Sequence, residues 1–182
     1  MKKAIGMVEF KTVSSGMRAA DCMVKTAEVE LLQADTVCPG KFLALISGDL
    51  SAVKAAVEAA AQQEAEQLID RFVLGNPHDS IFSALFGSAE IDSPNALGVL
   101  ETFSAAAAVV AADTAAKTAL VDLIELRLAR GTCGKSYLLL IGEVAAVEAA
   151  IEHAKQGAGE YGMFLDSAVI PRPDKKFWQK IL

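Results

Sequence analysis

The strongest constraint on the fold of this chain is an internal repeat. The sequence ALGVLE at residues 96–101 matches AIGMVE at residues 4–9, at an offset of 92 residues. Later matches keep the same order: KTA at 25–27 and 117–119, then Gly-Lys at 40–41 and 134–135, where the offset has grown to 94. Small changes in offset that fall in turns and helix ends are typical of a diverged duplication.

Each half shows the same alternation of strand and helix patterns. In the first half, strands are expected at 4–11, 30–37, 41–47 and 68–74. Helices are expected from an N-terminal cap at Ser14 or Ser15 to about residue 26, from 51, and at 80–86. This β-α-β-β-α-β order forms a small, mainly antiparallel sheet with helices on one face. We therefore predict an α/β chain of the α+β type, with two tandem ferredoxin-like units at residues 1–91 and 92–182 joined by a linker at 93–95.

Composition excludes several classes of function. The formal charge is −6, the pI is about 5.0, and no basic run is present, so a nucleic-acid partner has no electrostatic support. The most apolar run, 105–112, ends at Asp113 and is far shorter than the roughly 20 residues of a membrane-spanning helix. No signal-peptide pattern is found, so we expect a soluble cytoplasmic protein. With 53% hydrophobic residues and a mean hydropathy of +0.35, some apolar surface is expected to lie between subunits.

Two glycine turns between apolar strands are the candidate functional loops. The first contains Cys38-Pro39-Gly40-Lys41, and the second contains Thr132-Cys133-Gly134-Lys135. Proline stiffens such a turn, and glycine allows a close backbone approach. Because the three cysteines include no Cys-x-x-Cys pair, one chain cannot supply a standard zinc or ferredoxin ligand set. On the residues alone, a single loop cysteine is more often a small apolar residue than a ligand.

Several spaced motifs resemble the bacterial microcompartment shell-protein domain. The resemblance occurs once in each half and together covers nearly the whole chain. The motifs are AIGMVEF at 4–10, AADCMVKTA at 19–27, the Gly-Lys turn, and GDLSAV at 48–53. The tandem arrangement is similar to that of double-domain shell proteins that form trimeric, pseudohexameric tiles. Residues 38–42 further resemble the pore turn of the T-type shell proteins of propanediol-utilisation microcompartments, in which a cysteine binds an iron–sulfur cluster on the trimer axis.

The resemblance implies one [4Fe–4S] cluster per homotrimer, bound through Cys38 of three subunits, with an exogenous ligand on the fourth iron. It also implies that Pro39, Gly40, Lys41, Thr132, Gly134 and Lys135 form the loops around the pore. Lys41, if nearby, is expected to offset the negative charge of the thiolates. Cys133 departs from the family pattern because glycine is expected there. Its three copies can supply extra ligands, tune the cluster or narrow the opening, and these alternatives stay open; Cys22 is assigned to packing.

Three basic residues are expected at the edges of the tile. Lys25 and Lys117 occupy matching positions in the Ala-Asp-x-x-x-Lys motif, where the family pairs tiles side by side, although a solvated helix lysine is the simpler interpretation. Arg172 resembles the family's arginine that enters a neighbouring tile. The first repeat has no arginine at 75–78, so this contact is expected to be asymmetric.

Enzyme signatures are weak. Gly134-Lys135-Ser136 looks like the end of a P-loop, but the position that would require the first glycine is Ala129. We therefore expect a non-enzymatic shell tile, located in the microcompartment shell within the cytoplasm, that passes electrons across the shell or delivers clusters. Its expected partners are other shell proteins and encapsulated redox enzymes. The alternatives are a tile with an open pore for small metabolites and no cofactor, and a small-molecule sensor on a duplicated ferredoxin-like fold.

Overall fold

The computed structural model describes residues 4–87, 95–159 and 162–181. The chain forms two compact units, Met1–Pro77 and His78–Leu182, each considered separately below. The predicted boundary between residues 91 and 92, and most of the linker at 93–95, lie outside the described residues.

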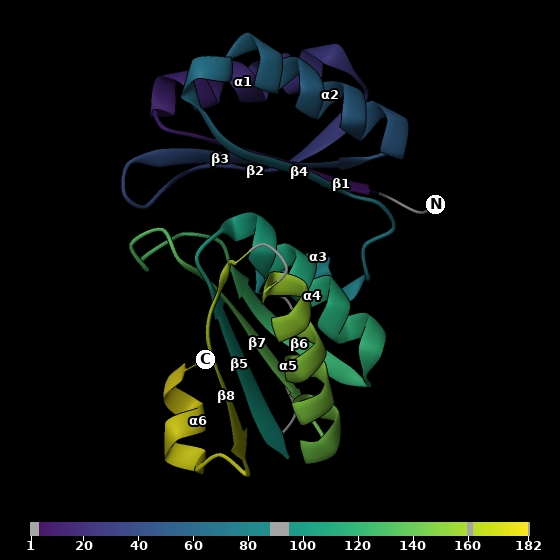
Figure 1. The fold of residues 1–182 in the computed structure, drawn as a ribbon, viewed down its shortest axis with the longest axis vertical. Coiled ribbons are helices and arrows are strands. Elements are labelled where there is room, and N and C mark those ends of the chain that lie inside the picture. Colours follow the sequence, from purple (N-terminus) through teal and green to yellow (C-terminus); the bar gives the residue numbers. More distant parts are fainter. Residues whose placement is uncertain (1–3, 88–94, 160–161, 182) are drawn as a thin grey trace. The chain divides into compact units, whose positions relative to one another are not determined.

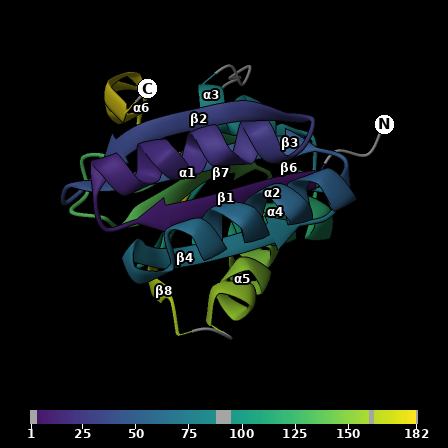
Figure 2. The same cartoon turned by 90° about the horizontal axis from the view of Figure 1, so that it is seen from above.

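The first unit is a four-stranded antiparallel sheet covered on one face by two helices (Figures 1 and 2). The strand order is β2-β3-β1-β4. The elements are β1 (Ala4–Phe10), α1 (Val13–Thr26), β2 (Val29–Val37), β3 (Lys41–Gly48), α2 (Leu50–Gln63), a 3-10 turn (Ala65–Gln67) and β4 (Leu68–Leu74).

Alternation along β1 explains how the helices lie on the sheet. Ala4, Val8 and Phe10 belong to the buried cluster formed with α1 and α2, as expected where every second residue faces the core. The N-terminal cap of α1 is Thr12, whose Oγ1 accepts a hydrogen bond from the Ser15 amide at 3.4 Å. The expected caps, Ser14 and Ser15, instead lie within the helix, because the hydroxyl that reaches back to the first-turn amides is that of Thr12.

The second unit repeats this architecture, with the order β6-β7-β5-β8 (Figure 1). The two units also share irregularities: the register shifts after Glu9 in β1 and after Glu101 in β5. The tandem α+β prediction is thus confirmed. The elements are β5 (Ala96–Thr102), α4 (Ala105–Thr118), β6 (Val121–Arg127), β7 (Ser136–Gly142), α5 (Val144–Gly159) and β8 (Phe164–Pro171).

Two short helices complete the second unit. Helix α3 (Ser80–Phe86) was expected to end the first half, but it packs against β6 and α4 with Ile81 and Ala84 buried. Its counterpart α6 (Lys175–Ile181) packs through Trp178 and Ile181 against Leu97, Ile124, Leu139 and Ile141 of its own sheet. Among the described helices, none is both long and apolar enough to cross a membrane.

Candidate functional site

The first candidate turn joins β2 to β3 by three residues. Val37 pairs with Lys41 across its base, and the Gly40 amide donates a hydrogen bond to the Val37 carbonyl at 3.0 Å. Gly40 has φ +88°, a conformation that disfavours any side chain, although a Cβ there would meet nothing within 4 Å. Glycine is therefore required by conformation and not by space. Cys38, half-buried at the start of the turn, has a free thiol.

An ion pair anchors the base of this turn. The Lys41 ammonium contacts the Glu9 carboxylate, and both side chains are largely buried. Asp70 faces Glu9 across the β1–β4 pair. Burial raises the pKa of Asp70, while the Arg71 amide and the Lys41 charge act in the opposite direction. Sequence reasoning expected Lys41 to offset charge at the thiolate, whereas the structure places its ammonium beside Glu9.

The second turn, between β6 and β7, is longer and differently built. Its backbone has positive φ at Ala129, Gly131, Cys133 and Gly134. The Ala129 amide donates to Ser136 Oγ at 3.0 Å, and the Lys135 amide donates to the Thr132 carbonyl at 3.2 Å. Cys133 is exposed on this turn. The two predicted turns therefore both exist, but they differ in backbone and in the exposure of their cysteines.

Side chains that can ligate a metal lie apart from one another in the part of the chain that the structure describes. Within the described residues, no group of three His, Cys, Asp or Glu side chains is arranged to bind an ion. Cys38 lies in the first unit and Cys133 in the second, so each turn offers one thiol. A thiolate-bound cluster at Cys38 fits this chain only if several copies contribute one thiolate each.

The expected edge residues have unequal surroundings. Lys25 forms an exposed pair with Asp21 at 2.6 Å. Lys117 forms the matching pair with Asp113, also at 2.6 Å, but Asp113 is buried and its Oδ1 accepts a hydrogen bond from the His78 amide at 2.8 Å. Arg172 is exposed in the left-handed region at φ +47°, and its amide donates to the Asn95 carbonyl at 2.7 Å. Sequence reasoning missed the His78–Asp113 bond.

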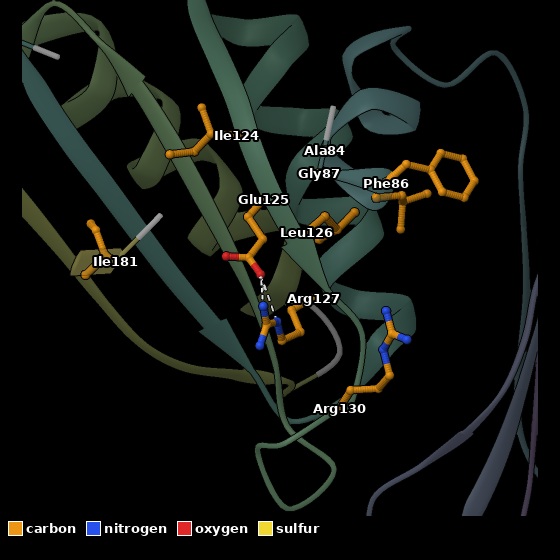
Figure 3. A pocket seen from close by; sticks show the side chains of 10 residues that line it. Ala84, Phe86, Gly87, Ile124, Glu125, Leu126, Arg127, Arg130 and Ile181 are labelled. Carbon is orange, nitrogen blue, oxygen red and sulfur yellow. Dashed lines mark hydrogen bonds and ion pairs between the residues drawn. The ribbon is translucent and has the colours of Figure 1, made fainter. Parts of the chain in front are cut away.

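A cavity of about 540 Å³ lies beside α3 in the second unit (Figure 3). Arg127 lines the cavity and is paired with Glu125, and its guanidinium lies 5.5 Å from the centre of the Tyr137 ring. No sequence motif pointed to this cavity, because its walls come from separate segments. They are Ala84–Gly87, Ile124–Arg127, Arg130 and Ile181.

Comparison with known families identifies the fold. The BMC domain matches residues 4–77 and again residues 96–173, so the chain belongs to the BMC-domain family. It is a tandem-domain shell protein of the bacterial microcompartment.

Individual relatives agree with this assignment. The chain is 39% identical over 182 residues to the shell protein PduT of Citrobacter freundii, covering 100% of this chain and 99% of that one. It is 33% identical over 96 residues to the shell protein EutK of Salmonella typhimurium, covering 52% of this chain and 58% of EutK. A microcompartment protein of Desulfitobacterium hafniense has a TM-score of 0.93 at 42% identity, covering 98% and 99% of the two chains. A fused permuted hexameric shell protein of the RMM microcompartment shares the fold at a TM-score of 0.66 and 23% identity, covering 87% and 84%.

Proposed function

We propose that this chain is the subunit of a non-enzymatic, trimeric shell tile that binds one [4Fe–4S] cluster on its threefold axis through Cys38 of three subunits. The observation that carries the proposal is the place of Cys38. A free thiol lies at a tight turn between the edge strand β2 and its neighbour β3, and the described residues of one chain bring no set of metal ligands together. Three thiolates arranged around an axis would supply three of the four iron ligands, leaving the fourth iron to an exogenous group.

The residues around Cys38 suit a fixed ligand. The Gly40–Val37 hydrogen bond closes the turn, and the Glu9–Lys41 ion pair fastens the start of β3. A cluster bound here would supply one-electron transfer, and the role of this chain is to hold the thiolate at a constant position. Such a site suits electron transfer across the shell, or delivery of clusters to encapsulated redox enzymes.

The second candidate function is an open pore that passes small metabolites without a cofactor. The build of the second turn favours it. This turn is rich in glycine, its cysteine is exposed, and no group of three metal-ligating side chains is found among the described residues. In that case both turns would shape an opening, and Lys135 would add positive charge to its rim.

Iron and sulfide analysis of anaerobically purified protein separates the two functions. We expect about four irons and four sulfides per trimer in the wild type, with the broad visible absorbance of a cluster. Cys38→Ser should lose both, whereas the matched variants Cys22→Ser and Cys133→Ser should retain them. A colourless wild-type trimer that takes up no stoichiometric iron on reconstitution would exclude the cluster and favour the open pore.

A further inference from the structure

The turn between β6 and β7 leaves backbone amides unpaired where the turn between β2 and β3 does not. In the first turn the Gly40 amide donates to the Val37 carbonyl at 3.0 Å, and Gly40 is exposed. Its counterpart Gly134 is buried, and among the described residues no acceptor is found for its amide or for the amides of residues 131–133. Because a buried amide without a partner is rare and costly, these donors indicate a place for an acceptor from outside the protein.

The backbone of the second turn has the alternation that forms an anion-binding concavity. The value of φ is positive at Ala129, Gly131 and Cys133, whereas Arg130 and Thr132 between them lie outside the left-handed region. Alternation between left-handed and right-handed residues turns successive N–H groups towards one side, as in phosphate-binding loops. The sequence failed the P-loop pattern because Ala129 stands where glycine is required. In the structure Ala129, with φ +54°, nevertheless holds the left-handed conformation that glycine adopts most easily.

The charge around this turn also suits an anion. The chain has a formal charge of −6, yet residues 127–136 contain Arg127, Arg130 and Lys135 and no acidic residue. Lys41, the counterpart of Lys135, is paired with Glu9, whereas Lys135 forms no ion pair among the described residues. Arg130 and the already paired Arg127 line the cavity next to the turn (Figure 3). The turn therefore concentrates positive charge in an otherwise acidic chain.

Two hydroxyl groups hold the turn closed and are themselves occupied. Ser136, which is 1% exposed, accepts a hydrogen bond from the Ala129 amide at 3.0 Å. The Thr132 hydroxyl donates to the Lys135 carbonyl, and the Lys135 amide donates to the Thr132 carbonyl at 3.2 Å. Because Ser136 is used in this way and a strand follows in place of a helix, the part of the P-loop pattern that binds magnesium is not reproduced. The turn offers amides and one ammonium, which suits a single phosphate group.

We infer that the turn at residues 130–135 binds a phosphate group, either as inorganic phosphate or as part of a small phosphate monoester. The amides of residues 131–134 donate to the phosphate oxygens, and the Lys135 ammonium pairs with their charge. Hydrogen bonds to a charged acceptor are about twice as strong as neutral ones, so they offset the entropy lost when a glycine-rich turn is ordered. The inference goes beyond the proposed function, because it requires neither Cys38 nor a cluster.

Isothermal titration calorimetry of the purified full chain with inorganic phosphate tests the site. The buffer contains no phosphate and little salt, because salt screens contacts between exposed charges. Lys135→Met should raise the dissociation constant at least about tenfold, as expected for the loss of one charge-assisted contact. The matched control is Lys54→Met, which removes an exposed charge on α2 and should leave the dissociation constant unchanged.

A pair of substitutions at Thr132 tests the backbone amides themselves. Thr132→Pro removes one amide at a position outside the left-handed region, where the fixed φ of proline is admissible, and should raise the dissociation constant at least about tenfold. Thr132→Val keeps the amide and removes only the hydroxyl, so its effect on the dissociation constant should be much smaller. Circular dichroism melting shows whether each variant remains folded.

A second titrant distinguishes the two sources of the phosphate group. Glycerol 3-phosphate carries the same group on a short neutral body. If it binds at least about tenfold more tightly than inorganic phosphate, the ligand is a monoester whose body contacts neighbouring residues. If it binds equally or more weakly, the ligand is inorganic phosphate. Acetate, which carries a single charge, should compete with neither compound.

The outcomes separate this inference from the proposed function. Phosphate binding that is weakened by Lys135→Met and Thr132→Pro, and unchanged in Cys38→Ser, supports the site. Absence of binding at millimolar phosphate, or binding that both Lys135→Met and Thr132→Pro retain, overturns it. Binding that is lost in a folded Cys38→Ser variant also overturns it, since the site would then depend on the cluster. A wild-type protein that binds phosphate but no iron overturns only the proposed cluster.

Discussion

At the scale of single residues, the duplicated glycines of the first strands show why the repeat is recognisable. A Cβ on Gly6 would lie 2.6 Å from Val53 Cγ1 and 2.7 Å from Val57 Cγ2. At Gly98 the nearest atom is Leu140 Cδ1, at 2.7 Å, and Val147 and Ile151 follow at 3.0 and 3.1 Å. Both glycines thus allow a helix to lie close on the sheet, but the neighbours of Gly6 are stiffer.

We predict that Gly6→Ala destabilises the protein by about 1–3 kcal/mol, because an added methyl in a filled core forces its neighbours to shift. The matched change Gly98→Ala should cost less, since its closest neighbour is the flexible end of a leucine. Urea unfolding measures both, and Val53→Ala should partly rescue Gly6→Ala. Equal costs at the two sites would contradict this account.

Side-chain partners were the least predictable part of the site. Sequence correctly indicated that Cys38, Gly40 and Lys41 share a turn between strands, because strand patterns and glycine positions are local. It did not indicate that Lys41 pairs with Glu9, since this depends on the register of β1 against β3. The roles of the turn residues in a pore or cluster site stay predictions.

At the scale of elements, the two helix pairs are joined by different chemistry. Arg18 of α1 donates two hydrogen bonds of 2.7 Å to the Glu64 carboxylate at the end of α2. The corresponding residues of the second unit are Val110 and Ala158, which are apolar. Only the first unit therefore has a charge-dependent link between its helices at this point.

This link predicts a pH dependence of stability. The hydrogen bond from Arg18 lowers the pKa of Glu64 from its ordinary value of 4.5. A carboxylate with a lowered pKa stabilises the fold above its ordinary pKa, and this contribution is lost as the pH falls through the folded-state value. The melting temperature of Arg18→Met should thus lie below that of the wild type at about pH 7, and the gap should close towards about pH 3.

The comparison between variants is essential, because Asp70 acts in the opposite sense. Burial raises the pKa of Asp70, so its contribution to stability improves as the pH falls. The difference in melting temperature between Arg18→Met and the wild type at each pH removes the contribution of Asp70, because both proteins contain it. The matched control is Lys54→Met, which removes another exposed charge, on α2. Its difference in melting temperature from the wild type should not shrink over the pH range in which Glu64 is protonated. A gap for Arg18→Met that is constant with pH would contradict the assignment.

Most elements could be predicted, because their patterns are local. The strands at 41–48 and 68–74 and the helix beginning at Leu50 follow directly from apolar periodicity and turn residues. The start of α1 was predicted too late. Thr12 lies two residues before the expected cap. The first residue of the helix is Val13, and its β-branched side chain lowers the helix propensity of the first turn.

At the scale of the whole molecule, the repeats in the sequence and the compact units in space do not coincide. Sequence periodicity assigns α3 to the first repeat, but it packs in the second unit. Periodicity could not reveal this, because the contact joins segments far apart in sequence, such as His78 and Asp113. Each repeat can be recognised from neighbouring residues in the sequence, whereas the unit against which its last helix packs depends on contacts between distant residues.

This difference gives a test with fragments of the chain. A fragment of residues 78–182 retains α3, whereas residues 95–182 lack it and expose the edge of β6. Loss of the buried Ile81 side chain and of the His78–Asp113 hydrogen bond should lower the free energy of unfolding by about 2–4 kcal/mol. Urea unfolding should also give a larger m-value for the longer fragment, because it buries more surface. Ile81→Asp in the longer fragment is the matched variant and should fall to the stability of the shorter one. If both fragments unfold at the same free energy, α3 contributes nothing to the stability of the second unit.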